Sequence, residues 1–279
     1  MPPRRRLDAE LVRRGVADSR ASAARLIEAG QVLVAGAPAD KPARLVSPDE
    51  PLQLVGPPPR FVGRGGEKLD AALVRFGIDV RGRAALDAGA STGGFTDCLL
   101  QAGAERVVAV DVGRGQLRER LRADPRVEVR ERTDIRSVPS SGERYPLIVA
   151  DLSFISVRSV AAPLVALAQP GADIVVLVKP QFEAGRAEVS RGKGVIRDPE
   201  VWRRALEEAI TAMEDAGAAN MGVMVSPLRG ADGNVEFLAW FRAGPAAVDS
   251  ATADPSATLE ARVAAVVRVA AAETTGSAE

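Results

Sequence analysis

The strongest constraint on the fold is an alternation of short apolar runs with helical stretches between Gly63 and Ala243. Stretches such as PEVWRRALEEAITAMEDAG, which has helical periodicity, separate most of these runs. The alternation predicts an α/β fold with a doubly wound, Rossmann-like, seven-stranded sheet. Only PLRGADGN separates the last two runs, so the last strand should be antiparallel to its neighbour. The seven predicted strands are RAALDA, RVVAVDV, VEVRERT, LIVADLS, IVVLVKP, MGVMVS and EFLAWF.

A glycine-rich loop follows the first of these strands. In a doubly wound sheet, such a loop lies where nucleotide-like ligands bind. The G-x-G-x-x-G spacing that dinucleotide sites prefer is absent. The candidate ligand contacts of the loop are Gly89, Ala90, Ser91, Thr92, Gly93, Gly94 and Phe95.

Three acidic residues lie near strand ends beside this loop. Asp87 precedes the first glycine, Asp111 ends the second strand, and Asp134 follows the third. Asp111 suits a grip on ribose hydroxyls, and Asp134 could accept a hydrogen bond from an adenine amine. This set favours adenosine carrying a positive charge over a pyrophosphate, and S-adenosylmethionine (SAM) has that character. Alternatively, Asp87 and Asp111 are strand-terminating turn residues, a frequent role of aspartate.

Lysine is rare in this chain, and histidine is absent, so the commonest general base is unavailable. The only lysines are Lys41, Lys68, Lys179 and Lys193, against a background of arginine. Lys179 ends the fifth predicted strand, and Asp151 ends the fourth. The ends of these two strands are adjacent in a doubly wound sheet. We therefore expect Asp151 and Lys179 to lie side by side at the rim of the ligand crevice.

Residues 1–56 form a distinct, arginine-rich segment with two predicted helices and the strand QVLVAG. Asp18 or Ser19 can cap the second helix. Clustered arginine supports salt-dependent attachment to a polyanion such as RNA. The alternative is a small helical domain with a solvated charged face. The arginines of the first 25 residues are Arg4, Arg5, Arg6, Arg13, Arg14, Arg20 and Arg25.

The remaining segments set the domain boundaries and the compartment. GPPPR predicts a stiff connector, placed at 57–62, with Phe61 and Val62 free to dock on either side. Residues 244–279 are Ala-rich, and we expect a loosely ordered tail in which LEARVAAVVRVAAA can form one helix. The sole cysteine, Cys98, excludes an intrachain disulfide, and the lack of histidine excludes a Cys/His zinc site. No run approaches the roughly 18 apolar residues of a membrane span. The N-terminus also lacks a signal peptide. We expect a cytoplasmic protein with no metal and no membrane partner.

Two groups of motifs carry a family resemblance. RLDAELVRRGVADSRASAARLIEAGQVLVAG resembles the S4-like RNA-binding domain. Behind it stand GRGGEKL, LDAGASTGGFT, DVGRGQL, ADLSFIS, LVKPQFEAG, KGVIRDP and GNVEFL. The whole chain therefore resembles the TlyA family, in which an S4-like domain (here 1–56) precedes an FtsJ-type ribosomal RNA 2′-O-methyltransferase domain (here 63–243). That family was historically labelled haemolysin.

The resemblance implies an activity and a set of site residues. The activity is SAM-dependent 2′-O-methylation of cytidine in 16S and also 23S ribosomal RNA, with ribosomal subunits as partners. The implied catalytic set is Lys68, Asp151, Lys179 and Glu236, with Asp151 also near the cofactor. The implied RNA contacts are Arg4, Arg6, Arg20, Arg25, Arg64 and Phe154. Phe154 is also compatible with a place in the core.

The chain departs from the family pattern at two places. Phe61-Val62-Gly63-Arg64-Gly65 stands where the family commonly has Tyr or Trp followed by Val-Ser-Arg-Gly. Asp134 stands where Asn is usual.

Two functional questions stay open at the level of sequence. Lys179 could act deprotonated, as the acceptor of the ribose hydroxyl proton, or protonated, by polarising that hydroxyl. A non-catalytic RNA-binding assembly factor is the alternative to an enzyme. A haemolysin acting on membranes is the third and weakest interpretation, because only residues 259–272 approach an amphipathic membrane binder, and they carry few cations.

Overall fold

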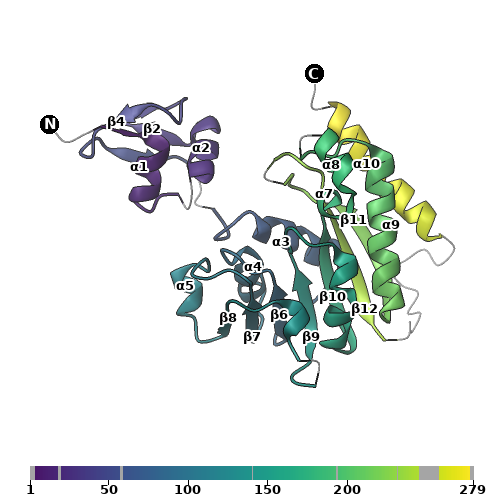
Figure 1. Cartoon of the computed structure of the whole chain (residues 1–279). Helices are drawn as coiled ribbons and strands as arrows, with labels where there is room; N and C mark the ends of the chain where they lie inside the picture. The colour runs from purple at the N-terminus through teal and green to yellow at the C-terminus, as the bar shows by residue number, and fades with distance from the viewer. Residues whose placement is uncertain are drawn as a thin grey trace. The chain divides into compact units, whose positions relative to one another are not determined.

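The computed structural model describes residues 4–17, 20–56, 59–139, 141–192, 194–230, 232–244 and 258–276. The chain divides into two compact units, Met1–Pro59 and Arg60–Glu279 (Figure 1). Each unit has a hydrophobic core of its own.

The first unit packs two helices against short strands. Helices α1 (Leu7–Arg13) and α2 (Arg20–Glu28) enclose a core with members such as Leu7, Leu11 and Ile27. The predicted pair of helices and the following strand are therefore present, whereas the predicted cap at Asp18 or Ser19 lies outside the described residues. The strands are β1 (Arg5–Arg6) paired with β4 (Leu45–Val46), and β2 (Val32–Val34) between β3 (Ala37–Pro38) and β5 (Leu52–Leu54).

The second unit is built on a seven-stranded sheet with the order β11-β12-β10-β9-β6-β7-β8. Only β12 is antiparallel to its neighbours β10 and β11, so the predicted sheet and its antiparallel last strand are confirmed. The sequence did not indicate that β12 inserts between β10 and β11. The strands are β6 (Ala84–Ala88), β7 (Arg106–Val110), β8 (Val127–Arg130), β9 (Tyr145–Ala150), β10 (Ala168–Val178), β11 (Ala218–Val225) and β12 (Phe237–Ala243).

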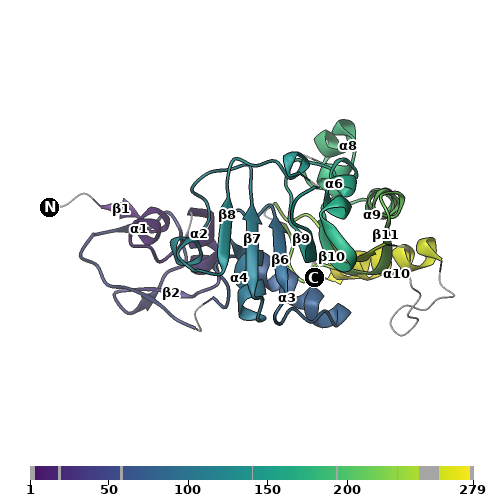
Figure 2. The same cartoon turned by 90° about the horizontal axis from the view of Figure 1, so that it is seen from below.

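Helices cover both faces of this sheet. Figure 2 shows α3 (Gly65–Phe76) and α4 (Gly94–Gln101) on one face, and α6 (Ala161–Ala166) and α9 (Pro199–Asp215) on the other. Because both faces are buried, the central strands read as continuous apolar runs. The shorter helices are α5 (Glu119–Arg122), α7 (Pro180–Glu183), α8 (Arg186–Arg191), η1 (Ile135–Ser137) and η2 (Val157–Ser159).

Strand β6, the first of the sheet, lies between β7 and β9. The chain therefore leaves β6 toward one side of the sheet and returns later on the other side. In an open α/β sheet, this reversal creates the crevice in which ligands bind, at the carboxyl ends of the strands. The glycine loop follows β6 directly and thus lies at that crevice.

The helix that the sequence allowed in the tail is present, but the tail is not loose at residues 259–276. They form helix α10 (Leu259–Gly276), which packs against α9 and β11. Val263, Val267 and Ala270 are buried because they recur on one face of the helix. The Ala-rich composition concealed this apolar stripe.

The predicted connector also ends earlier than expected. Arg60 begins the second unit. The Phe61 ring is buried there against Gly66, where a Cβ atom would approach it to 2.3 Å. Val62 donates its amide to Asp97 Oδ2 at 2.8 Å. Both residues therefore dock on the second unit, one of the two options that the sequence left open.

Across the described residues, no helix is both long and apolar enough to cross a membrane.

Ala270→Asp should lower the free energy of unfolding by at least about 2 kcal/mol, because it places a charge in a buried position of α10. The matched control is Val269→Asp, at a position that is 52% exposed on the same helix. Its effect should stay within about 0.5 kcal/mol. Urea unfolding of both variants measures the difference, and equal effects would contradict the packing of α10.

Candidate active site

The glycine loop between β6 and α4 lies against the end of β9. Gly89 has φ +88°, and a Cβ atom there would lie 2.5 Å from the backbone oxygen of Asp151. The Asp151 amide in turn donates to Ala88 O at 3.0 Å. Only glycine allows this close approach, so Gly89 brings the loop and Asp151 together.

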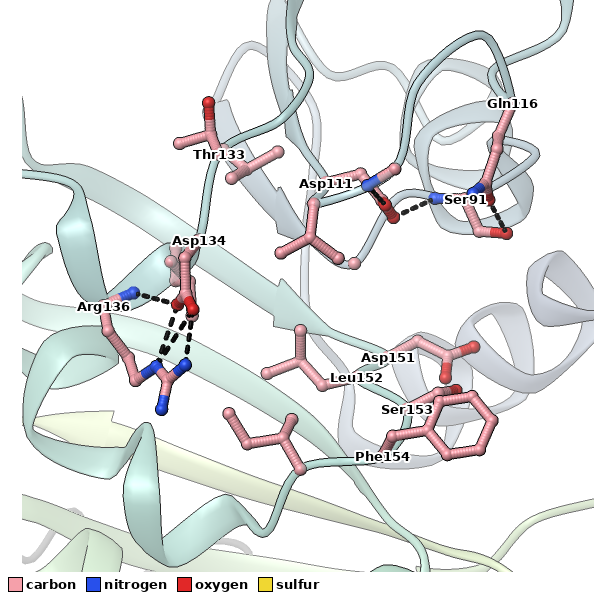
Figure 3. Close-up of a pocket in the computed structure, with 16 residues that line it drawn as sticks. Ser91, Asp111, Gln116, Thr133, Asp134, Arg136, Asp151, Leu152, Ser153 and Phe154 are labelled. Atoms are coloured by element: carbon pink, nitrogen blue, oxygen red, sulfur yellow. Dashed lines mark hydrogen bonds and ion pairs between the residues drawn. The ribbon is translucent and has the colours of Figure 1, made fainter.

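A pocket of about 680 Å³ opens beside this loop (Figure 3). Residues after β6, β7, β8 and β9 line it. Of the predicted site residues, the lining includes Gly89, Ser91, Asp111, Asp134, Asp151 and Phe154. The sequence analysis missed other lining residues, which a search just beyond each strand end would have found. They include Val112, Gly113, Gln116, Thr133, Ile135, Arg136, Leu152 and Ser153.

Asp111 is held in place by backbone amides. Its Oδ2 accepts from Ser91 N at 2.8 Å and its Oδ1 from Gly113 N at 2.6 Å. Each carboxylate oxygen can accept a further hydrogen bond. Asp111 is therefore fixed in orientation with capacity left for ligand hydroxyls.

Asp134 shares its carboxylate with Arg136. The Arg136 Nε lies 3.0 Å from Asp134 Oδ1 and its guanidinium also contacts Oδ2 at 2.5 Å. These hydrogen bonds lower the pKa of Asp134 to about 2. A ligand amine that binds Asp134 would therefore share an ionised carboxylate with Arg136.

Asp87 does not line the pocket. It is fully buried within β6, where its Oδ2 accepts from Thr96 Oγ1 at 2.6 Å. Its Oδ1 has no hydrogen-bond partner among the described residues. Burial raises the pKa of Asp87 to about 7. Asp87 is thus neither an exposed ligand contact nor a turn residue in this structure. The other predicted loop contacts that do not line the pocket are Ala90, Thr92, Gly93, Gly94 and Phe95.

Two lysine–carboxylate pairs lie at the carboxyl edge of the sheet. Lys179 Nζ lies 2.6 Å from Asp151 Oδ1 and 2.9 Å from Ser153 Oγ. Asp151 and Lys179 are therefore neighbours, as the parallel order of β9 and β10 predicts. Lys68 pairs with Glu236, both buried.

The two pairs are connected through the start of α3. A Cβ atom at Gly65 would lie 3.6 Å from Asp151 Oδ2, so the helix that carries Lys68 begins against Asp151. Glu236 is confined by Gly230, where a Cβ atom would lie 2.6 Å from Glu236 Oε1. The structure therefore brings all four predicted catalytic residues to one edge of the second unit.

Phe154 is not a core residue. Its side chain is 91% exposed beside the pocket, and its backbone has φ +64°. This left-handed conformation is strained for a bulky residue and costs about 1–3 kcal/mol. The Phe154 ring centroid lies 5.1 Å from that of Phe182.

In the first unit, two buried carboxylates organise four arginines. Asp8 Oδ2 accepts from Arg6 Nη2 at 2.9 Å and from Arg20 Nη2 at 3.0 Å. The Arg6 hydrogen bond is the largest cause that lowers the pKa of Asp8 to about 2. Glu10 binds Arg13 and Arg14 in the same way.

The other predicted RNA contacts have different surroundings. Arg4 is exposed, and the side chain of Arg25 lies outside the described residues. Arg64 belongs to the second unit, where its guanidinium donates to the backbone oxygen of Arg229 at 2.9 Å.

Two family models match the chain: FtsJ-like methyltransferase at residues 61–243 and S4 domain at residues 5–52. The relatives include the 16S/23S rRNA (cytidine-2′-O)-methyltransferase TlyA of Mycobacterium tuberculosis, 51% identical over 87% of this chain and 91% of that protein. Hemolysin A of Brachyspira hyodysenteriae is 41% identical over 85% of this chain and 99% of that protein. A solved structure from Streptococcus thermophilus that carries a hemolysin name is 34% identical, with a TM-score of 0.75. It covers 99% of this chain, and the match spans 100% of that one.

Asp87→Asn should become increasingly stabilising, relative to the unmodified protein, as the pH rises from about 4 to about 8. The pKa of Asp87 is raised from 3.8 to about 7, so the folded chain keeps a proton that the unfolded chain releases. Stability from Asp87 is therefore fully present below about pH 4 and lost as the pH rises through about 7. This difference of about three units between the folded and unfolded pKa corresponds to a change in the free energy of unfolding of roughly 4 kcal/mol as an upper limit.

Urea unfolding of both proteins at the two pH values measures this change. The Asn amide does not titrate, so its other effects on stability cancel in the comparison. A difference between the proteins that is the same at both pH values would contradict a proton held by Asp87.

Proposed function

Because the chain belongs to the TlyA family of FtsJ-like methyltransferases, we propose that it transfers a methyl group from SAM to the 2′-hydroxyl of cytidine in 16S and 23S ribosomal RNA. The observation that carries the proposal is the Lys179–Asp151 pair at the rim of the pocket, 2.6 Å between Nζ and Oδ1. In this proposal, residues 1–56 dock the RNA and residues 63–243 hold the cofactor and the reacting hydroxyl.

The pocket suits SAM in size and in charge. Its volume of about 680 Å³ lies within the usual range of small-ligand sites. Among the described residues that line it, three are carboxylates, Asp111, Asp134 and Asp151, and the one cation, Arg136, is paired with Asp134. A site of this charge favours a sulfonium over a pyrophosphate. When bound, SAM supplies an electrophilic methyl group.

Different side chains in the pocket would contact different parts of SAM. Asp111 would accept from the ribose hydroxyls, because its orientation is already fixed by two backbone amides. Asp134 would accept from the adenine amine. Val112 and Ile135 supply apolar surface for the base.

Lys179 would position the attacking oxygen. An ammonium group has three N–H donors. Asp151 and Ser153 each accept one of them, which leaves one for the ribose hydroxyl. Transfer would break the bond between the methyl carbon and the sulfonium sulfur as the new C–O bond forms, and the proton of the ribose hydroxyl would leave to the Asp151 carboxylate of the Lys179–Asp151 pair. Lys68 and Glu236 would hold the other side of the site, and placement of the hydroxyl supplies much of the rate.

Arg6 and Arg20 would bind one RNA phosphate together. Their side chains are 46% and 59% exposed, and both guanidiniums contact the same buried Asp8 oxygen. Asp8 therefore holds two arginines close together although one lies just before α1 and the other begins α2. Charge-assisted hydrogen bonds from two fixed guanidiniums suit a phosphate group.

Lys179→Met should lower kcat for methyl transfer to ribosomal subunits by roughly 10²- to 10⁴-fold, because it removes the amine of the proton-accepting pair and keeps the side-chain length. The affinity for S-adenosylhomocysteine should be unchanged, since Lys179 does not line the cofactor pocket. Transfer of labelled methyl and calorimetric binding measure the two quantities. Full activity of the variant would contradict the proposed role. No transfer by the unmodified protein, despite tight RNA binding, would favour the assembly-factor function instead.

Asp8→Asn should weaken binding to ribosomal RNA by roughly tenfold, about 1.4 kcal/mol. The substitution makes the unit more positive, so charge alone predicts tighter binding, whereas loss of the shared anchor of Arg6 and Arg20 predicts weaker binding. The salt dependence of binding should also fall.

Glu10→Gln is the matched control, since it makes the same charge change in the same helix. Its partner Arg14 also donates to backbone oxygens such as Pro48 O at 2.7 Å, so contacts within the first unit already hold the Arg14 guanidinium. RNA affinity of this variant should stay near that of the unmodified protein. Filter binding at several salt concentrations decides, and tighter binding by Asp8→Asn would overturn the shared-phosphate interpretation.

A further inference from the structure

The exposed ring of Phe154 is held in an unfavourable place. The side chain is 91% exposed at the pocket, and the backbone adopts φ +64°. A strained and solvated aromatic residue persists only where its surroundings determine its conformation. The question is which contacts do so.

The segment that carries Phe154 is tied on both sides to the segment that follows β10. On one side, Ser153 Oγ accepts from Lys179 Nζ at 2.9 Å. On the other side, Val157 N donates to Glu183 Oε1 at 2.7 Å. Between these ties, Phe154 contacts the Phe182 ring. Residues 153–157 and the segment that follows β10 are therefore linked by contacts on both sides of Phe154.

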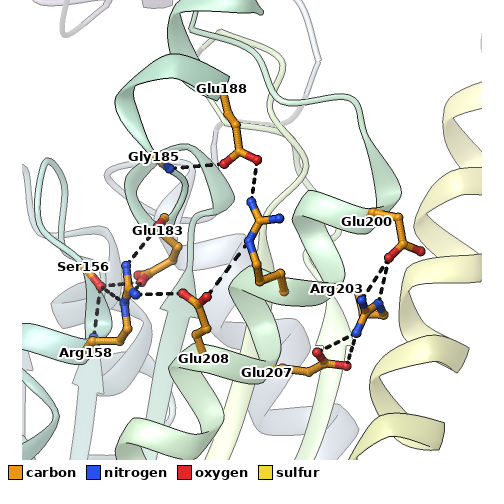
Figure 4. A network of polar contacts seen from close by, with 10 residues as sticks. Ser156, Arg158, Glu183, Gly185, Glu188, Glu200, Arg203, Glu207 and Glu208 are labelled. Atoms are coloured by element: carbon orange, nitrogen blue, oxygen red, sulfur yellow. Dashed lines mark hydrogen bonds and ion pairs between the residues drawn. The ribbon is translucent and has the colours of Figure 1, made fainter.

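Glu183 is the buried residue among these contacts. Its side chain is 1% exposed, and its two oxygens accept hydrogen bonds from the Ser156 hydroxyl and the Val157 amide. Arg158 returns from the same segment and donates to the backbone oxygen of Glu183 at 3.0 Å (Figure 4). Burial raises the pKa of Glu183, since these contacts only partly replace water.

Arg158 also reaches outward to α9. Its Nη1 lies 2.7 Å from Glu208 Oε2, a pair that Figure 4 also shows. This contact does not touch residues 153–157 directly. It therefore provides a control for the inner contacts of Glu183.

The family resemblance already implies that Phe154 contacts the RNA, and we propose that Glu183 is a positioning residue that holds the Phe154 ring in place to stack on a nucleobase of that RNA. The inference rests on the proposed function, because it gives the ring a role beside the reacting hydroxyl. Unpaired bases stack on exposed aromatic rings when proteins bind single-stranded RNA. Glu183 touches neither cofactor nor RNA in this role and acts through the conformation of residues 153–157.

The test is a double-mutant cycle with Glu183→Ala and Phe154→Ala in the full chain. Each single variant should lower kcat/KM for ribosomal RNA by roughly 10- to 100-fold, the effect of misplacing a substrate contact. The double variant should be no worse than Phe154→Ala alone, because Glu183 acts through Phe154. Independent, multiplying losses would overturn the proposal, as would full activity of Glu183→Ala.

Two further variants separate positioning from a general loss of structure. Glu183→Gln keeps an acceptor for the Val157 amide and can bond the Ser156 hydroxyl, so activity should be restored. Glu208→Ala removes the α9 partner of Arg158, together with a 4.0 Å ion pair to Arg204, and should leave activity unchanged. If Glu183→Ala did not fold, Ser156→Ala would take its place in the cycle, since it removes one of the two Glu183 contacts.

Hydrogen exchange of the Val157 amide gives a readout that needs no methyl transfer. Exchange should accelerate in Glu183→Ala and stay slow in Glu208→Ala. If the unmodified protein transferred no methyl group, the proposed function would fail, and this exchange together with RNA affinity would still decide the role of Glu183. Unchanged exchange in Glu183→Ala would refute it.

Discussion

The parallel pairing of β9 with β10 is the constraint on which the site depends. Both strands end at one edge of the sheet, so the residues after them, Asp151 and Lys179, emerge as neighbours and pair at 2.6 Å. Lys179 is 8% exposed, and a buried ammonium without a partner would be strongly unfavourable. The ion pair therefore stabilises this edge of the sheet, and it is also the reactive feature of the site. Removal of either partner leaves the other uncompensated.

Other segments of the second unit bring the remaining site residues to this pair. The glycine at position 89 lets the cofactor loop approach Asp151, and α3 begins against the same carboxylate while it carries Lys68. Strand β12 inserts beside β10 and places Glu236, the residue just before it, opposite Lys68. A short loop region and one antiparallel strand thus complete the set of four from segments far apart in the chain.

Much of this arrangement could be predicted from the sequence, because it follows from strand order. Seven apolar runs predicted the sheet, and strand ends predicted the meeting of Asp151 and Lys179. Features that depend on packing could not be predicted. Burial of Asp87 depends on the neighbouring strands and on Thr96. The left-handed conformation of Phe154 depends on ties to a segment about 30 residues away in sequence, through Glu183.

The sequence allowed a helix in the C-terminal tail but did not show that this helix packs on the second unit. Three buried positions suffice to pack α10, although its surroundings are rich in Ala, Thr and Ser. In the first unit, the arginine count indicated a polyanion partner, but it did not reveal that Asp8 joins Arg6 and Arg20 into one group. That pairing joins two helices and is visible only in three dimensions.

The most direct test of the account is the chemical position of the transferred methyl group. Ribosomal RNA would be incubated with the full chain and labelled SAM, digested to nucleosides and separated by mass spectrometry. The account predicts label in 2′-O-methylcytidine, on the ribose and stable to alkali. Label on a base, or on the ribose of another nucleoside only, would contradict it.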